Sequence, residues 1–404
     1  MKRYALAGAS GRALYMYAKP LVTELGEYAD VVGVFDVNTI RANIVSEECG
    51  GIPVYDDFNL MLEETRADAV IVTTVDGFHH EYIIRALEAG CDAITEKPMT
   101  IDAEKCRAIL EAEKRTGKEV IVTFNYRFTP YVTRVKEMLR DGIIGEILNI
   151  DFEWILDTVH GADYFRRWHR YMKNSGGLLV HKATHHFDLI NWWMEDEPEK
   201  VSAFGNRRFY GPTRIKWGER CLTCQYKGDC EFYWDITDNE FTKRFYLEAE
   251  GEDGYFRDRC VFADDIDIYD TMSVNVEYTK GGMLSYSLTA HSPYEGWRAA
   301  INGTEGRLEL EEIHSGPRTK EPSQQVKHYN RKGEVITYDI QKATGDHGGG
   351  DERIRRMIFV GDVRDPLGHR ADSWAGAMSA IIGIASNISI AEGRTVDVNE
   401  LIKK

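Results

Sequence analysis

The sequence predicts two domains: an N-terminal α/β domain of the Rossmann, dinucleotide-binding type over residues 1–124, and a C-terminal α+β domain over residues 125–404 with a mostly antiparallel open sheet. Three observations predict this fold class. The 404 residues are too many for one hydrophobic core. Residues 1–124 alternate short apolar strands with amphipathic helices, which is typical of a parallel sheet. Beyond Asn125, tryptophan and tyrosine become frequent and long alternating segments appear.

Five apolar segments in the N-terminal domain have the length and flanking turns of strands. Amphipathic helices fall between them; residues 81–89, for example, end at Gly90 in the position of a helix C-cap. Right-handed crossovers then make the sheet doubly wound. The five predicted strands are residues 4–7, 31–35, 69–73, 93–95 and 120–124.

Three features are predicted in the C-terminal domain. Residues 273–278 and 283–289 alternate in polarity, which predicts antiparallel strands with one covered face. Residues from about 204 to 262 form an irregular insert that contains cysteines, and residues 373–392 read as a buried helix rich in small side chains. An open sheet with an apolar face favours pairing with a second subunit, so we expect a homo-oligomer, a dimer or a tetramer.

The composition excludes several classes of partner. The net charge of −16 argues against a nucleic-acid ligand, whose binding depends on basic groups. No stretch reaches the roughly 18 apolar residues that a membrane-spanning helix needs, so we expect no membrane partner. The apolar run near the N-terminus is too short for a signal peptide and leads into a glycine turn, so a cytoplasmic location is expected.

A glycine-rich turn, GASGRA at residues 8–13, lies between the first strand and the first helix. A bound phosphate requires a tight turn, close backbone approach and free N–H groups at a helix N-terminus. Such a turn is also compatible with an ordinary strand-to-helix connection. Asp36 favours the cofactor interpretation, because it ends the second strand near the offset of an acid that binds adenosine ribose hydroxyls. An acid there repels a 2′-phosphate, so NAD is expected rather than NADP; an Asp that caps a turn is the alternative.

Lys97 follows the fourth predicted strand. Because ligands of such sheets bind at the carboxyl ends of the strands, its side chain is expected in the crevice, although Lys-Pro pairs also occur in surface turns. An ammonium there could bind a substrate hydroxyl, stabilise a developing alkoxide and relay a proton. The residues predicted to contact the cofactor are Gly8, Ser10, Gly11, Arg12, Ala13, Asp36, Thr73, Thr74, His79, Glu96, Lys97 and Asn125.

At this point the sequence resembles the Gfo/Idh/MocA family of oxidoreductases. The resemblance covers nearly the whole chain and implies hydride transfer between a sugar carbon and a nicotinamide, with Lys97 and a histidine near the reacting hydroxyl. The motifs that carry it, in the order of the family, are the loop at Gly8, Asp36, His79-His80-Glu81 followed by ALEAG, Glu96-Lys97-Pro98, Asn125-Tyr126-Arg127-Phe128, and Gly176-Gly177 leading to His185.

His181 and His185 share one face of a predicted helix, because they are four positions apart. The family resemblance implies an Asp at the place of His181, so the replacement by His alters the usual pairing. We expect His185 to act as general acid and base, and His181 to orient it, bind substrate or share the proton. A hydrogen-bonded core role is the structural alternative, and a divalent metal held by His181, His185 and either His169 or His347 is a third interpretation.

Further residues are expected to bind the sugar. Trp168 could stack on a ring, while Arg167 and His169 donate hydrogen bonds to hydroxyls; a half-buried aromatic loop is equally compatible with these residues. His347, followed by three glycines and Asp351, could close the pocket. The residues predicted to bind substrate are Arg127, Trp168, His169, His181 and His347.

Four cysteines gather in the predicted insert: Cys221, Cys224, Cys230 and Cys260. Four thiolates suit a structural zinc ion that would fasten a segment without a core of its own. An iron–sulfur cluster and unliganded thiols are the alternatives, and the family resemblance gives no support for a metal.

The sequence therefore predicts an NAD-dependent oxidoreductase that acts on a secondary hydroxyl of a sugar or polyol. Two alternatives stay open. The first is an enzyme that uses bound NAD transiently to cleave a glycoside by oxidation, elimination and reduction, with no net NADH. The second is a sugar-binding sensor that has lost its chemistry.

Overall fold

The computed structural model describes residues 1–361 and 364–403, and its N-terminal half contains the predicted parallel sheet. The strand order is β15-β6-β5-β4-β1-β2-β3, and all neighbours pair in parallel except β15 with β6. The five predicted strands are confirmed; β3 and β15, with two residues each, are additional. The strands are β1 (Lys2–Ala7), β2 (Ala29–Phe35), β3 (Val54–Tyr55), β4 (Ala69–Val72), β5 (Asp92–Thr95), β6 (Val120–Val122) and β15 (Ala371–Asp372).

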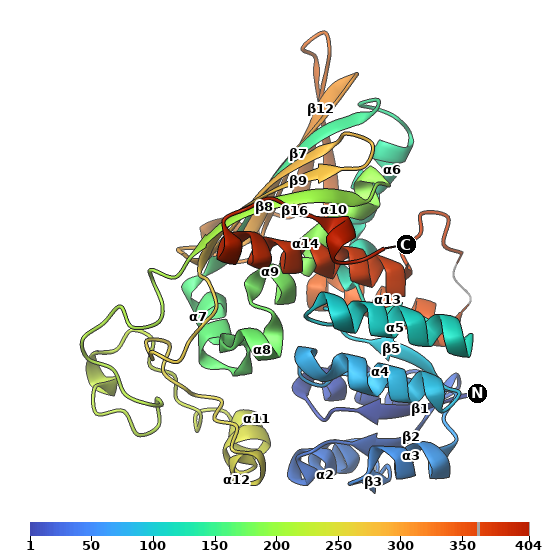
Figure 1. The fold of residues 1–404 in the computed structure, drawn as a ribbon, viewed down its shortest axis with the longest axis vertical. Helices are drawn as coiled ribbons and strands as arrows, with labels where there is room; N and C mark the ends of the chain where they lie inside the picture. Colours follow the sequence, from blue (N-terminus) through green and yellow to red (C-terminus); the bar gives the residue numbers. More distant parts are fainter. Residues whose placement is uncertain (362–363, 404) are drawn as a thin grey trace.

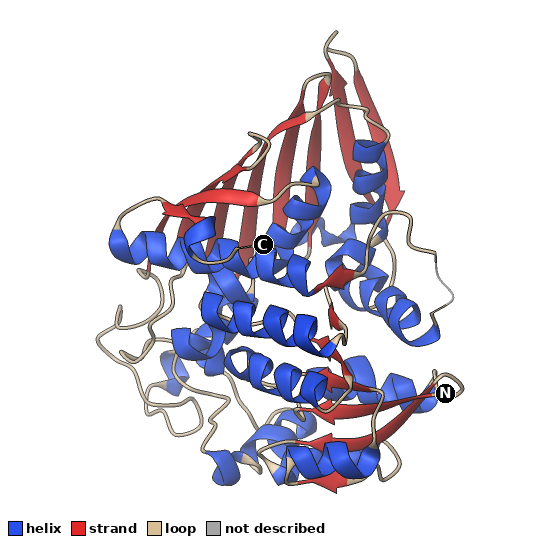
Figure 2. Cartoon of the chain, turned by 45° about the vertical axis from the view of Figure 1, so that its right-hand side comes forward, coloured by secondary structure: helices blue, strands red, loops and turns tan. Residues whose placement is uncertain are grey.

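Helices cover both faces of this sheet (Figure 2). Their N-termini carry side-chain caps: Asn38, Asp57 and Asp102 each accept a hydrogen bond from the first turn of a helix. The helix predicted over residues 81–89 is present, and Gly90 follows it with a φ of 86°. The helices of this domain are α1 (Lys19–Thr23), preceded by a π-helical turn (Ala13–Ala18), α2 (Thr39–Glu48), α3 (Phe58–Thr65), α4 (His79–Glu88) and α5 (Ala103–Thr116).

The C-terminal domain contains a nine-stranded sheet in the order β14-β13-β12-β11-β7-β10-β9-β8-β16. All neighbouring strands are antiparallel except β7 and β10, so the predicted mostly antiparallel sheet is confirmed. The strands are β7 (Ile147–Asp157), β8 (Pro198–Asn206), β9 (Thr271–Tyr278), β10 (Met283–Ser292), β11 (Gly296–Gly303), β12 (Gly306–Ile313), β13 (Ser323–Asn330), β14 (Val335–Gln341) and β16 (Val396–Asp397).

Helices of this domain cover the apolar face of the sheet, where α14 packs against β8 and α10 (Figure 1). Alternate residues of β9 are buried on this face. Of the described helices only α14 is long and apolar enough to span a membrane, and 67% of its most apolar window is buried inside the protein. The helices are α6 (Pro130–Arg140), α7 (Thr158–Arg166), α8 (Met172–Ser175), α9 (Leu178–His181), α10 (Thr184–Met194), α13 (Gly350–Arg355) and α14 (Ser373–Glu392).

The open face of the nine-stranded sheet is polar. A hollow of about 960 Å³ lies over it, and side chains such as Glu153, Asn275 and Arg298 line it; none of the predicted catalytic residues is among its lining residues. The apolar face that was expected to pair with a second subunit is covered by helices of the same chain. The argument for a homo-oligomer from this apolar face is therefore wrong. The oligomeric state stays a prediction.

The irregular insert connects β8 to β9 and therefore spans residues 207–270, close to the predicted 204–262. It carries only short helices, among them α11 (Glu240–Thr242) and α12 (Glu250–Asp253). Figure 1 shows that the insert leaves the C-terminal domain and reaches the N-terminal domain, where α12 lies beside α2. The two domains are thus joined along the crevice as well as through the backbone.

Candidate functional site

A cavity of about 860 Å³ begins at the carboxyl ends of the parallel strands and continues between the domains. This is where ligands of doubly wound sheets bind. It contains ten of the twelve residues predicted to contact a cofactor and the three predicted catalytic residues. These lining residues are Ser10, Gly11, Arg12, Asp36, Thr73, Thr74, His79, Glu96, Lys97, Asn125, His181 and His185.

The two predicted residues outside the cavity lining, Gly8 and Ala13, shape its glycine-rich turn. Gly8 has a φ of +102°, and a Cβ atom there would lie 2.8 Å from the backbone of Thr73 and Thr74. Only glycine therefore fits. The Ala13 N–H donates to Ser10 Oγ at 3.0 Å, which caps the helix after the turn. A helix N-terminus with a close glycine turn fits the pyrophosphate of a dinucleotide.

Asp36 stands at the end of β2 and lines the same cavity. Its carboxylate accepts hydrogen bonds from the Ala9 N–H at 2.6 Å and from the Asn38 N–H at 2.7 Å, which fix its orientation. Burial raises its pKa, and the nearby Arg41 guanidinium opposes that rise. The position fits an acid that accepts hydrogen bonds from the ribose hydroxyls.

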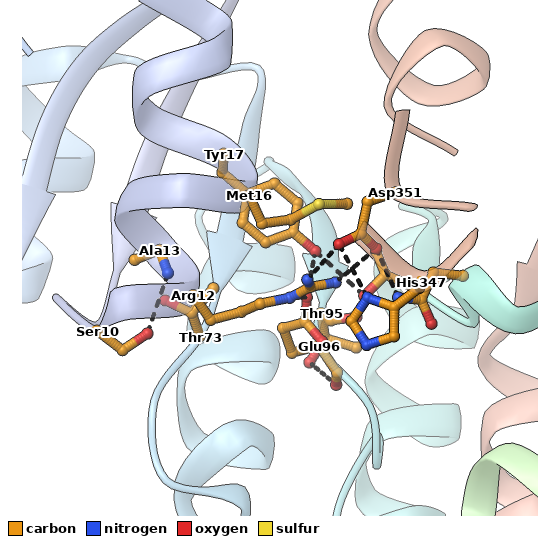
Figure 3. A network of polar contacts seen from close by, with 12 residues as sticks. Ser10, Arg12, Ala13, Met16, Tyr17, Thr73, Thr95, Glu96, His347 and Asp351 are labelled. Atoms are coloured by element: carbon orange, nitrogen blue, oxygen red, sulfur yellow. Dashed lines mark hydrogen bonds and ion pairs between the residues drawn. The ribbon is translucent and has the colours of Figure 1, made fainter. Parts of the chain in front are cut away.

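Arg12 connects the glycine-rich turn to the C-terminal domain (Figure 3). Its guanidinium donates to Glu96 at 2.7 Å and to Asp351 at 2.7 and 3.2 Å, so its side chain acts as a clamp. Tyr17 adds a hydroxyl that donates to Glu96 at 2.7 Å. His347 Nδ1 lies 3.1 Å from Asp351 Oδ2. Burial alone would raise the pKa of Asp351, but hydrogen bonds and positive charge from His347 and Arg12 outweigh burial and hold this pKa well below its usual range.

Lys97 is one of the cationic groups that line the cavity. Its Nζ donates to the His181 carbonyl at 2.9 Å, which aims the side chain across the crevice. Burial lowers its pKa from 10.5 to about 8, although Asp76 raises it. An ammonium with a pKa close to neutrality is well suited to stabilise an alkoxide and to exchange a proton.

His181 is paired with a carboxylate that the sequence analysis missed. Its Nδ1 lies 2.5 Å from Oδ2 of Asp76, which is buried in the turn between β4 and α4. Burial raises the pKa of Asp76, whereas the Lys97 charge lowers it. Asp76 thus brings an acid into contact with His181, whereas the family resemblance implies an acid at position 181 itself. No spacing pattern marks Asp76, because it becomes significant only once the turn after β4 meets the end of α9.

His185 lines the cavity and lies among aromatic rings, 5.5 Å from the Tyr126 ring centroid. Its Nδ1 is buried and has no hydrogen-bond partner among the described residues. Burial is the main cause that holds the pKa of His185 well below 6.5, and the positive charges of Lys97 and Lys182 lower it further. A neutral imidazole is therefore available to accept a proton at pH 7.

Three other residues predicted to bind substrate line the cavity: Trp168, His169 and His347. The Trp168 and His169 rings are stacked with their centroids 3.6 Å apart, and the His169 and His181 rings pack edge to face with their centroids 4.2 Å apart. The structure places Arg127 elsewhere: its guanidinium forms a buried two-point ion pair with Asp188, at 2.7 and 2.6 Å, and does not line the cavity.

Lys182 is a second lining residue that the sequence analysis missed. Its ammonium lies 4.6 Å above the Trp154 ring, and burial lowers its pKa although Glu295 opposes that shift. Lys182 also lines an adjoining cavity of about 400 Å³, which shares His160 and His347 with the first. The crevice therefore continues beyond the predicted catalytic groups.

The four cysteines of the insert line one small cavity of about 20 Å³. Among residues 1–361 and 364–403, however, no group of three or more His, Cys, Asp or Glu side chains is arranged to hold a metal ion. Arg166 donates to Cys221 Sγ at 3.1 Å, and burial raises the pKa of the Cys221 and Cys260 thiols. None of the four thiols is in a disulfide. Because no such group is arranged for a metal among the described residues, the structure does not support the predicted zinc site or the alternative metal site at the histidines.

Comparison with known proteins agrees with this architecture. A family model described as "Oxidoreductase family, NAD-binding Rossmann fold" matches residues 2–124, and one described as "Oxidoreductase family, C-terminal alpha/beta domain" matches residues 136–398. Across its whole length the chain is 37% identical to "Putative oxidoreductase YteT" of Bacillus subtilis, and the match covers 99% of that protein.

More distant matches are shorter or concern the fold alone. D-glucoside 3-dehydrogenase of Escherichia coli is 31% identical over 36% of this chain and 41% of its own length. The WlbA dehydrogenase of Chromobacterium violaceum, solved with NADH and UDP-GlcNAcA, superposes with a TM-score of 0.67 at 19% identity, over 98% of this chain and 95% of its own. The fold is thus shared with known oxidoreductases.

Proposed function

The chain belongs to the Gfo/Idh/MocA family of NAD(P)-binding oxidoreductases, and from this premise we propose that it transfers a hydride between a secondary hydroxyl of a sugar or polyol and NAD. One observation carries the proposal: Lys97 and His185, far apart in the sequence, line a single cavity that begins at the dinucleotide turn. The preference for NAD rests on Asp36, because its carboxylate would repel a 2′-phosphate.

The dinucleotide would be held by the turn at Gly8, the helix N-terminus that follows it, and Asp36. When bound, the nicotinamide supplies the hydride acceptor. The neutral His185 imidazole removes the hydroxyl proton, and the Lys97 ammonium stabilises the alkoxide. Asp76 orients His181 through the 2.5 Å contact and raises the pKa of Lys97, which keeps the ammonium charged. Trp168 and His169 bind the sugar ring and its hydroxyls.

A panel of sugars and polyols, offered with NAD and with NADP, tests the proposed function. We expect NADH to accumulate with at least one panel member and NAD to be preferred over NADP. Chromatography of the products is the second readout, because it detects conversion that forms no net NADH. Tight NAD binding without turnover of any panel member by either readout would contradict the proposal and favour a sensor.

Glycoside cleavage through transient oxidation is the second candidate function. The adjoining cavity favours it, because it offers room beyond His347 and Lys182 for the substituent of a glycoside. Product formation with no accumulation of NADH distinguishes this reaction from simple oxidation.

The pH dependence of sugar oxidation follows from the two groups. Oxidation needs a charged Lys97, whose pKa is about 8, and a neutral His185, whose pKa is held below 6.5. We expect kcat to stay flat from about pH 6.5 to 8 and then to fall about tenfold per pH unit as Lys97 loses its proton. Initial rates at saturating substrate, measured from about pH 5.5 to about pH 10, check this. A rate that keeps rising above pH 8 would assign Lys97 the opposite role, that of a neutral base.

A further inference from the structure

The insert forms part of the wall of the dinucleotide cavity. Side chains from residues 241–257 face the turn at Ala9–Arg12 and the end of β2 across the cavity. Two aromatic residues approach closest: a Cβ atom on Gly11 would lie 3.5 Å from the Phe241 ring and 3.6 Å from the Tyr246 hydroxyl. The C-terminal domain therefore contributes to the half of the site that the Rossmann domain is expected to form.

Residues at and beside α12 join the insert to the start of α2. Asn38 Nδ2 donates to the Ala249 carbonyl at 2.8 Å, and Glu252 accepts from Thr39 Oγ1 at 2.6 Å and from the Ile40 N–H at 3.0 Å. These contacts hold α12 directly against the loop that follows Asp36.

The next residue of α12, Asp253, forms an ion pair with Arg41. Arg41 is largely buried, and its Nη2 lies 3.7 Å from Asp36 Oδ1. Its Nη1 is buried and has no hydrogen-bond partner among the described residues. A guanidinium so close to the ribose-binding acid is the group that would attract a 2′-phosphate, since Arg binds phosphate through planar, charge-assisted hydrogen bonds.

We propose that Asp253 is a determinant of cofactor specificity: it engages Arg41 and adds a second carboxylate beside the adenosine ribose, so that the insert helps to exclude NADP. This inference rests on the proposed NAD preference. Both effects disfavour a 2′-phosphate. The ion pair occupies Arg41, the cation that would bind the phosphate, and the added carboxylate repels the negative charge of the phosphate. Neither penalises the 2′-hydroxyl of NAD.

Calorimetric titration of the full chain with NAD⁺ and with NADP⁺ tests the inference. In Asp253→Ala we expect the affinity for NADP⁺ to rise by about tenfold relative to NAD⁺, and Asp253→Asn to give a smaller rise in the same direction. The double variant Arg41→Met with Asp253→Ala should lose this gain, because the phosphate would have no cation to bind.

Two matched variants separate charge from architecture. Glu252→Gln weakens the attachment of α12 but keeps the Asp253 charge, and Asp229→Asn removes an exposed charge of the insert outside the cavity lining. Both should keep the wild-type ratio of affinities. An unchanged ratio in both Asp253 variants, with unaltered melting temperatures, overturns the inference, as does an equal change in Glu252→Gln. A wild-type chain that binds both dinucleotides equally refutes the NAD preference itself.

Discussion

Replacing Lys97 with methionine is expected to lower kcat by about 10³-fold while the affinity for NAD stays within a factor of about three. Methionine matches the unbranched apolar stem of lysine but lacks the ammonium that binds the substrate oxygen and stabilises the alkoxide. Lys97 Nζ also donates to the His181 carbonyl, so the melting temperature must be measured beside the rate.

Lys19→Met is the matched control for Lys97→Met. Lys19 pairs with Glu48 at the surface of the N-terminal domain, with its side chain 45% exposed, and lies outside the cavity lining. Surface ion pairs contribute little to stability, so this variant should keep the wild-type rate and melting temperature. A Lys97→Met protein that binds NAD and still turns over at more than a tenth of the wild-type rate would contradict the role of Lys97.

Most of the fold could be predicted because its signals are local. Apolar strands of three to five residues, helix caps and the glycine turn are read within a short window of sequence. In the parallel sheet, the strands that escaped prediction are β3 and β15, whose two residues are too few to show a period; in the nine-stranded sheet only β9 and β10 were predicted by position. β15 also joins the N-terminal sheet from the far end of the chain, so its place depends on tertiary pairing with β6.

The site was predictable where the fold itself fixes a position. Lys97 and Asp36 follow strand ends, which the parallel sheet brings to one edge. Asp76, in contrast, follows β4 by several residues and reaches His181 only through the packing of the two domains. The position of Arg127 also depends on tertiary structure, because Asp188 on α10 pairs with its guanidinium inside the core.

The insert shows the same limit more sharply. Its irregular sequence gives no periodicity, and its cysteine spacing suggested a metal site that the structure does not support. What holds α12 in place is a set of contacts with the start of α2, more than 200 positions away in the sequence, such as Glu252 with Thr39. Such long-range pairing leaves no pattern in a single sequence.

Replacing Asp76 with asparagine is expected to move the alkaline fall of the rate to lower pH by about one unit, which lowers kcat roughly fivefold at pH 8 and roughly tenfold at pH 9. Asparagine can still accept a hydrogen bond from His181 Nδ1, so the change isolates the charge. The Asp76 carboxylate raises the pKa of Lys97, which burial has lowered to about 8. Without that negative charge the pKa of Lys97 falls further, and the ammonium that oxidation requires is lost at a lower pH.

The shift of the pH profile distinguishes Asp76 as a positioning residue from a merely structural one. A structural defect would lower the rate at every pH and leave the alkaline limb of the profile in place. Asp141→Asn, an exposed acid after α6, is the matched control and should keep both rate and profile. An Asp76→Asn protein with the wild-type limb near pH 8 would show that the Asp76 charge does not act on Lys97. The proton exchange of the site would then depend on Lys97 and His185 alone.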